Sequence, residues 1–293
     1  MASLAMSYRI GKSTVSGIIQ ETCEAIWKVL QPQVLEQPSQ QDWIKIEDEF
    51  FKKWNFPHCI GAIDGKHVVI QAPPHAGSTF YNFKGQHSIV LLAVVSASYK
   101  FLMVDIGAQG RHNDGRIFKE SNMGQRFHNK QMDLPPPCPL SNFRNIPIPY
   151  MLVGDAAFQL TEYMLRPYPV NQLNRSRRIF NYRLSRARRI SENAFSFLVN
   201  IWRIYRKPIN ASLKTTESII KATVCLHNFL LSTRQYRDMA DDTCRNVIQE
   251  NTAIRNVSNI GSNTHSQLAA SIRNEFCEYF VQEGSVPWQE MYI

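Results

Sequence analysis

The sequence predicts an α/β protein in which helices flank a mixed five-stranded sheet. Two observations lead to this fold class. Apolar runs rich in β-branched residues, separated by turn residues, fill the stretch 59–107, and one more follows at 150–154; such runs are typical of strands. Amphipathic patterns at helical spacing come before and after them. A chain of 293 residues, 44% of them hydrophobic, is large enough to bury a core between such layers.

The N-terminus predicts two helices joined by a turn, a helix-turn-helix-like segment that we assign to residues 1–40. A short helix at 4–8 precedes Arg9-Ile10-Gly11, and a longer amphipathic helix starts near Ser13. An ordinary helical hairpin explains this pattern equally well. A linker rich in Pro and Gln follows at 31–41, and spaced aromatic residues then indicate a further helix.

The sheet is predicted from five short runs. Asp64-Gly65-Lys66 has the composition of a tight hairpin turn between the first two strands, and Ser98-Tyr99-Lys100 separates the next two. The last run is apolar on both faces, which favours a central position in the sheet. The predicted strands are 59–63, 68–71, 88–98, 101–107 and 150–154.

Helical patterns dominate the rest of the chain. A polar stretch rich in Asn and Ser, 238–267, is expected to be mobile. We therefore expect a core α/β domain at 41–235, followed at 236–293 by this mobile segment and a closing helix. The predicted helices are 115–121, 160–166, 181–206, 216–235 and 269–282, with a Pro-rich loop at 133–149.

The net positive charge indicates the kind of partner that the protein binds. Lys and Arg total 33 and Asp and Glu total 24, so the formal charge is 33 − 24 = +9. We expect an anionic partner, with nucleic acid ranked before an anionic membrane. No apolar run approaches the ~20 residues of a membrane-spanning helix, and the residues after Met1 predict no signal peptide. The six cysteines include no C-x-x-C pair, which argues against a structural zinc site.

One segment concentrates the positive charge. Residues 174–189 contain seven arginines and no acid, and the guanidinium fork matches the geometry of phosphate oxygens. We expect this segment to hold a DNA backbone, with a strong salt dependence. A nuclear-localisation patch and a solvated helix face are the alternatives. The predicted DNA-binding residues are Arg175, Arg177, Arg178, Arg183, Arg186, Arg188 and Arg189.

Three acids are candidates for a metal site. Asp64 and Asp155 are each placed at the end of a predicted strand, where ligands gather in open α/β sheets, and Glu192 lies alone among the arginines of the long helix. If the three converge, their oxygens suit a pair of Mg²⁺ ions that assist phosphodiester cleavage. Each also has an alternative role: Asp64 as a turn residue, Asp155 as a helix cap, and Glu192 as the partner of Arg188.

Five motifs occur in order along the chain: Cys59–His67, Tyr81–Gly85, Val153–Phe158, Phe180–Arg189 and Glu192–Phe195. Together they resemble the PIF/Harbinger transposase superfamily and, more narrowly, its domesticated Harbinger-derived nucleases. The resemblance implies an RNase H-like fold, which makes 41–235 a nuclease domain. It also implies a DDE triad at Asp64, Asp155 and Glu192, with Asp114 in a supporting role. The implied chemistry is DNA cleavage with Mg²⁺ or Mn²⁺ as the cofactor.

The same resemblance implies partners and a location. Harbinger-type transposases work beside a Myb-like DNA-binding protein, so we expect DNA and such a protein as partners. The expected location is the nucleus, with the cytoplasm as a second compartment. No membrane association is expected, and the sequence does not address the oligomeric state.

Two departures from the family pattern keep a second hypothesis open. Ala156 stands where the family often has a glutamate, which weakens the charge around the metal ligands. Met1 falls almost inside the helix-turn-helix outline, so we expect that segment to be truncated. The first hypothesis is a metal-dependent DNA endonuclease. The alternative is a catalytically inactive derivative that acts as a DNA-binding or chromatin-associated interaction protein.

Overall fold

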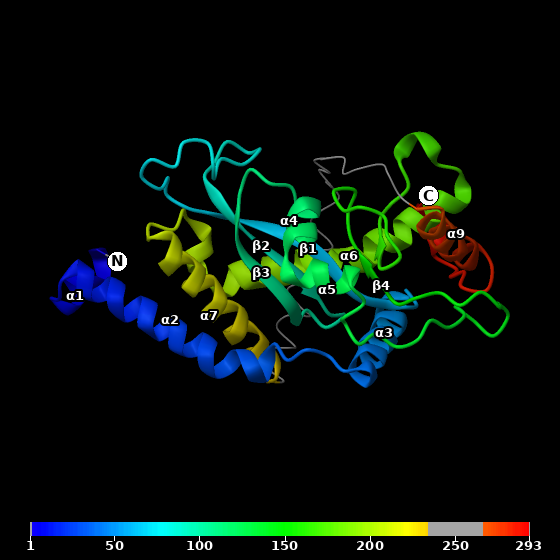
Figure 1. The fold of residues 1–293 in the computed structure, drawn as a ribbon, viewed down its shortest axis with the longest axis horizontal. Coiled ribbons are helices and arrows are strands. Elements are labelled where there is room, and N and C mark those ends of the chain that lie inside the picture. The colour runs from blue at the N-terminus through cyan, green and yellow to red at the C-terminus, as the bar shows by residue number, and fades with distance from the viewer. Residues whose placement is uncertain (1, 234–265, 293) are drawn as a thin grey trace.

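A five-stranded sheet with helices on both faces forms the centre of the protein (Figure 1). The structure is a computed structural model that describes residues 2–233 and 266–292. The strand order is β3-β2-β1-β4-β5. β2 pairs antiparallel with β1 and β3, whereas β4 pairs parallel with β1 and β5. This mixed sheet flanked by helices confirms the predicted fold class.

The elements follow the predicted order for most of the chain. The strands are β1 (Cys59–Val69), β2 (Ser88–Val95), β3 (Phe101–Gln109), β4 (Met151–Val153) and β5 (Met164–Leu165). The helices are α1 (Ala2–Tyr8), α2 (Lys12–Val34), α3 (Gln40–Trp54), α4 (Asp114–Glu120), α5 (Asn122–His128), α6 (Arg175–Ile201), α7 (Leu213–Leu231) and α9 (Gln267–Val281). Short 3₁₀ turns are η1 (Val170–Gln172), η2 (Arg203–Arg206) and η3 (Gln289–Tyr292). The polar stretch predicted to be mobile, 238–267, lies outside the described residues except for its last two positions.

Different helices cover the two faces of the sheet (Figure 1). On one face Val153 joins a core with Leu184 of α6 and with buried residues of α7 and α9. On the other face Leu152 joins a second core with Phe118 of α4 and with residues of α5. Because side chains alternate along a strand, neighbouring residues of β4 serve the two cores in turn. β4 is therefore buried on both sides, as its continuous apolar run predicted, and so is the first part of β1, residues 59–63.

β1 runs without a break through Asp64-Gly65-Lys66, so the predicted hairpin turn at this point is wrong. Residues 62–69 pair in order with residues 95–88 of β2, and the connection between the two strands is at 70–87 instead. Gly65 is needed here for close packing and not for a turn. A Cβ built there would lie 2.2 Å from Oδ1 of Asp114, so only glycine leaves room for that carboxylate.

The predicted helix at 160–166 is also wrong. Its centre forms β5, in which Met164 and Leu165 pair parallel with Leu152 and Val153 of β4. Both residues of β5 are buried. The pairing satisfies backbone groups at the sheet edge, a gain that comes from distant parts of the chain and outweighs a weak local helical pattern.

The N-terminal helices pack onto the rest of the protein. α2 lies along α7, as Figure 1 shows, and Thr215 at the start of α7 donates a hydrogen bond to Gln20 of α2 at 3.3 Å. α1 and α2 are joined at residues 9–11, where Arg9 has a positive φ of 53°. The division at 1–40, 41–235 and 236–293 stays a prediction. Within residues 2–233 and 266–292, no helix combines the length and apolar character needed to cross a bilayer.

Candidate active site

Asp64 and Asp155 lie level on neighbouring strands at the centre of the sheet. β1 and β4 are parallel, with Ala62 opposite Val153, so the two aspartates follow two positions further along each chain. Parallel neighbours are ~4.8 Å apart, and residues two apart on a strand share a face. Ala62 and Val153 both belong to the core beneath α6. The two aspartates therefore face the side of the sheet that α6 covers.

The turn after β4 holds the carboxylate of Asp155 in place. Its Oδ1 accepts a hydrogen bond from the backbone N–H of Ala157 at 2.8 Å. Gly154 lets this turn approach the sheet, because a Cβ there would lie 2.7 Å from the ring of Phe158 and 3.1 Å from Cγ2 of Ile63. Asp155 is thus oriented by its own turn, and the close packing of Gly154 on Ile63 keeps it beside Asp64.

Asp114 reaches the same place from the opposite face of the sheet. It is the first residue of α4, and Asn113 caps that helix by accepting a hydrogen bond from the Arg116 N–H at 2.8 Å. Its carboxylate fills the space beside Gly65, whose backbone N–H donates to it. The next residue, Gly115, packs so closely on the Asp155 turn that a Cβ would lie 2.2 Å from the carbonyl oxygen of Ala157. Two glycines therefore bring Asp114 to the strands that carry the other aspartates.

Glu192 lies on α6 and its side chain is 54% exposed. It accepts a hydrogen bond from Nη2 of Arg188 at 2.7 Å, so the ion pair foreseen as its alternative role is present. Arg188 itself is mostly buried, with 15% of its side chain exposed. In the arrangement that the described residues adopt, no three His, Cys, Asp or Glu side chains are grouped closely enough to hold a metal ion. A full set of ligands would require Glu192 to turn away from Arg188.

The acids nevertheless share one electrostatic environment. Burial raises the pKa of Asp64 to about 8, against the favourable charge of Arg188, and the charges of Asp114, Asp155 and Glu192 raise it further. Burial and the charge of Asp155 raise the pKa of Asp114 to about 6. Clustered carboxylates with raised pKa values are typical of sites that bind a cation. Their oxygens are the donors that hard ions such as Mg²⁺ and Mn²⁺ prefer, so the residues fit such an ion in chemistry, with Glu192 having to turn to complete the set.

The comparison with protein families decides the relationship. Residues 63–228 match the family described as DDE superfamily endonuclease. The chain belongs to this family. The matched region begins one residue before Asp64 and includes Asp114, Asp155 and Glu192. The match confirms the resemblance inferred from the ordered sequence motifs, and the mixed sheet flanked by helices agrees with it.

The chain also matches named proteins, at identities of 25% to 28%. It is 25% identical to the Arabidopsis thaliana protein named Antagonist of Like Heterochromatin Protein 1, over 80% of this chain and 59% of that protein. It is 28% identical to an ALP1-like protein of the same organism, over 83% of this chain and 58% of that protein. It is 25% identical to a Rattus norvegicus protein named "Putative nuclease HARBI1", over 64% of this chain and 50% of that protein. The chain thus spans half to three fifths of these relatives. No solved structure matches it.

Arg183 was predicted to bind DNA, but its side chain is buried and cannot reach a DNA backbone. It is 1% exposed, and its guanidinium donates to the Gly284 carbonyl at 3.1 Å, to Oε1 of Gln289 at 2.9 Å and to the Asn55 carbonyl. It also lies 4.4 Å from the ring centroid of Phe280. Burial lowers its pKa to about 10, so it stays charged at neutral pH. Arg183 fastens the C-terminal segment to α6.

Three more of the predicted DNA-binding arginines also have partners within the protein. Arg175 pairs with Glu290, and the guanidinium of Arg186 stacks 3.9 Å from the ring centroid of Trp288. Arg177 donates to the carbonyl of Gln172 at 2.8 Å. Arg175 remains 68% exposed despite its pair. The residues that the structure leaves accessible for a phosphate contact are Arg175 and Arg178, with Arg177, Arg186 and Arg189 half-buried.

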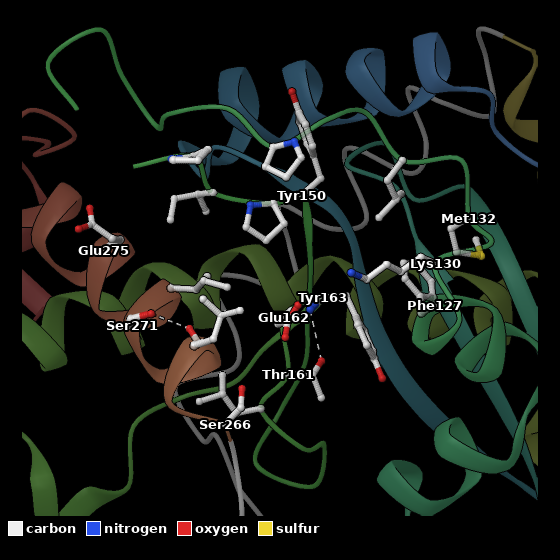
Figure 2. Close-up of a pocket in the computed structure, with 18 of the residues that line it drawn as sticks. Phe127, Lys130, Met132, Tyr150, Thr161, Glu162, Tyr163, Ser266, Ser271 and Glu275 are labelled. Carbon is white, nitrogen blue, oxygen red and sulfur yellow. Dashed lines mark hydrogen bonds between the residues drawn. The ribbon is translucent and has the colours of Figure 1, made fainter. Parts of the chain in front are cut away.

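A cavity of about 810 Å³ lies elsewhere, between the Pro-rich loop, the segment before β5 and the start of α9 (Figure 2). The stacked rings of Tyr163 and Phe127, 5.7 Å apart, form part of its wall. Its charged lining residues include Lys130, Glu162 and Glu275, and Glu275 lies across the cavity from Glu162 in Figure 2. None of the four clustered acids lines it. This cavity is therefore separate from the candidate active site.

Proposed function

We propose that this chain is a metal-dependent DNA endonuclease that hydrolyses phosphodiester bonds. The observation that carries the proposal is the meeting of Asp64 and Asp155 on adjacent parallel strands, with Asp114 and Glu192 close enough to raise the pKa of Asp64. Such a concentration of negative charge on rigid elements is unfavourable unless a cation is bound. Membership of the DDE superfamily endonuclease family makes a nucleic-acid phosphodiester the natural substrate.

Asp64 and Asp155 are the residues that we propose hold the metal, with Glu192 and Asp114 completing the site. A bound pair of divalent ions would activate the attacking water and stabilise the leaving oxygen of the phosphodiester. The protein positions the ligands for this role: the N–H of Ala157 orients Asp155, and Gly65 admits Asp114. Arg188 offsets part of the negative charge in the free protein. The sheet keeps the aspartates in fixed positions, which favours a site formed before the substrate arrives.

An interaction protein without catalysis is the second candidate, and one specific observation favours it. Glu192 is exposed and paired with Arg188, so the described residues hold no ready set of three ligands. The relative named Antagonist of Like Heterochromatin Protein 1 fits a chromatin-associated role by its name. This candidate predicts DNA binding that weakens with salt and no cleavage under any metal. A Myb-like partner and a nuclear location are proposed for both candidates.

Nicking of supercoiled plasmid DNA separates the two candidates. The full chain is incubated with Mg²⁺ or Mn²⁺ and compared with Asp155→Asn, which keeps an acceptor for the Ala157 N–H but removes the charge. Asp48→Asn is the matched control, because Asp48 lies on α3, half-exposed, and pairs with the exposed Lys52. We expect wild type and Asp48→Asn to nick, and Asp155→Asn to lose at least two orders of magnitude of rate. Equal rates for wild type and Asp155→Asn would exclude metal-dependent cleavage at this site.

A further inference from the structure

The connection between β1 and β2 exposes two aromatic rings beside the candidate active site. Phe83 is 53% exposed and Tyr81 is 50% exposed. Figure 1 shows this connection, residues 70–87, extending beyond the end of the sheet. Single exposed apolar side chains are common on protein surfaces, but two exposed rings in one short segment offer flat faces on which a partner can stack. The motif Tyr81–Gly85, which the nuclease chemistry does not explain, is therefore a candidate contact surface.

The turn that presents Phe83 is rigid. Asn82 is 3% exposed, and its Oδ1 accepts hydrogen bonds from the backbone N–H of Lys84 at 2.9 Å and of Gln86 at 3.1 Å. Its Nδ2 donates to Oγ of Ser88 at 3.0 Å, at the start of β2. Gly85 completes the turn with a φ of +76°, which favours glycine. A side chain that is held outward by such a network loses little conformational entropy when it binds.

The turn is tied to the strand that carries the acids. Nδ1 of His67 lies 2.9 Å from Oγ of Ser88, and the ring of Phe83 packs edge-on against His67 at 5.5 Å. His67 lies two positions beyond Gly65 on the same face of β1, so its Cα is ~7 Å along the strand from the point where Asp114 meets Gly65, and Phe83 lies one ring contact beyond it. This is the face from which Asp114 approaches, whereas Asp64 and Asp155 face α6. A base held by Phe83 would therefore be a few nucleotides from a phosphate at the acids.

Positive charges surround the two rings. The ammonium of Lys84 lies 5.5 Å from the ring centroid of Phe83. Lys84 is also near Lys66 of β1, since its charge contributes to lowering the pKa of Lys66. Arg111 is exposed at the end of β3, next to Gly110, whose N–H donates to the carbonyl of Ser88 at 3.0 Å. Rings and cations together match a nucleic acid, whose bases stack and whose phosphates are anionic; an apolar protein partner would not need the cations.

We propose that Phe83, assisted by Tyr81, stacks on an unpaired base of the DNA strand whose phosphate lies at the acids. Lys84, Lys66 and Arg111 hold the backbone on either side of that base. The inference rests on the proposed function for the identity of the substrate. It adds a substrate class: DNA with a base that is unpaired or extruded a few nucleotides from the cleaved bond. A fully paired duplex would keep its bases stacked on one another and away from these rings.

The test measures binding in EDTA, so that cleavage plays no part. Labelled duplex is compared with the same duplex containing one unpaired 2-aminopurine, whose fluorescence falls when it stacks. The variants are Phe83→Leu and, as a matched control, Phe143→Leu, because Phe143 is 87% exposed on the Pro-rich loop. Lys84→Gln reports on backbone contacts. Melting temperatures verify that each variant is folded.

We expect wild type to prefer the unpaired substrate by about tenfold, with quenched 2-aminopurine, as stacking on one aromatic side chain allows. Phe83→Leu should lose this preference and the quenching while its affinity for duplex is unchanged, and Phe143→Leu should behave as wild type. Lys84→Gln should lower the affinity for both substrates by the same factor and reduce the salt dependence of binding. Equal affinity of wild type for the two substrates, or no effect of Phe83→Leu, would overturn the inference and leave the rings to a protein partner. Loss of nicking with retained base stacking would reject only the nuclease proposal.

Discussion

The affinity of this chain for Mn²⁺ is expected to rise steeply between about pH 6 and pH 8. A metal ion binds ionised carboxylates, so protons compete with it wherever a ligand has a raised pKa. Burial raises the pKa of Asp64 to about 8 and that of Asp114 to about 6, with neighbouring acids adding to both shifts. Both groups are mostly protonated below pH 6 and mostly ionised above pH 8. The sign is therefore fixed: metal affinity increases as the pH rises.

The magnitude follows from the two pKa values. At pH 6 a group with a pKa of about 8 is ionised in about one molecule in a hundred, and at pH 8 in about half, which is a ~50-fold gain in binding-competent Asp64. Asp114, half ionised at about pH 6, adds a factor of up to ~2. The product is ~100-fold in affinity, or ~2.7 kcal/mol.

The nearby imidazoles do not account for a transition in this range. Burial and the charge of Lys84 lower the pKa of His67 to about 4, and burial lowers that of His112. The assay is a titration with Mn²⁺, in which free Mn²⁺ is followed by electron paramagnetic resonance across this pH range. Asp64→Asn should give a nearly flat profile and Asp48→Asn the wild-type profile. A flat profile for wild type would refute the assignment of Asp64 as a buried ligand.

Four further outcomes are expected. Without metal, Asp155→Asn should melt a few degrees higher than wild type, because relief of repulsion is worth ~1 kcal/mol, or ~2–4 °C in a chain of this size; scanning calorimetry checks this. Gly65→Ala should abolish nicking and lower the melting temperature, since the new Cβ would overlap the carboxylate of Asp114. Arg183→Ala should lose ~3 kcal/mol of stability in a denaturant titration by leaving buried acceptors unpaired. Arg178→Ala should weaken DNA binding in anisotropy assays and leave the melting temperature unchanged.

Regular patterns made the sheet and the long helices predictable. β2 and β3 were predicted within a few residues, because their β-branched runs carry the signal in the run itself. The turn at Asp64-Gly65-Lys66 was mispredicted because Asp-Gly has the same composition in a hairpin and in a strand that must admit a carboxylate. Only the position of Asp114, distant in sequence, distinguishes the two. β5 failed for the same reason, since its two residues depend on pairing with β4.

The candidate site was predictable as a set of residues but not as an arrangement. Asp155 follows β4, as predicted, whereas Asp64 lies inside β1 rather than at the end of a strand. Asp114 came from the family resemblance alone. The glycines at 65 and 115 were missed as site residues. Gly65 was assigned to a hairpin turn and Gly115 to no motif, and the role of both is visible only from what lies opposite them.

Arg183 shows where a charge pattern misleads. A run of arginines indicates affinity for phosphate, but Arg183 lies four residues before Ala187, on the buried stripe of α6. That spacing was available in the sequence and predicts burial. Its acceptors at Asn55, Gly284 and Gln289 were not, since they come from segments about a hundred or more positions away. The position of a basic residue around the helix is therefore a better guide to its exposure than the number of basic residues in the segment.

The acids and Arg188 together explain why the free protein is poised for a cation. Four carboxylates and one guanidinium would leave a charge of −3 if all were ionised, and protonation of Asp64, with its pKa of about 8, reduces this to −2 near neutral pH. Arg188 cannot balance the rest: it is engaged by the exposed Glu192, and its buried Nε has no hydrogen-bond partner among the described residues. A divalent cation held by Asp64 and Asp155 would offset most of this charge and would favour the ionised form of Asp64. The fold thus concentrates uncompensated negative charge at the place where the proposed chemistry needs a metal. Repulsion among these carboxylates lowers the stability of the free protein.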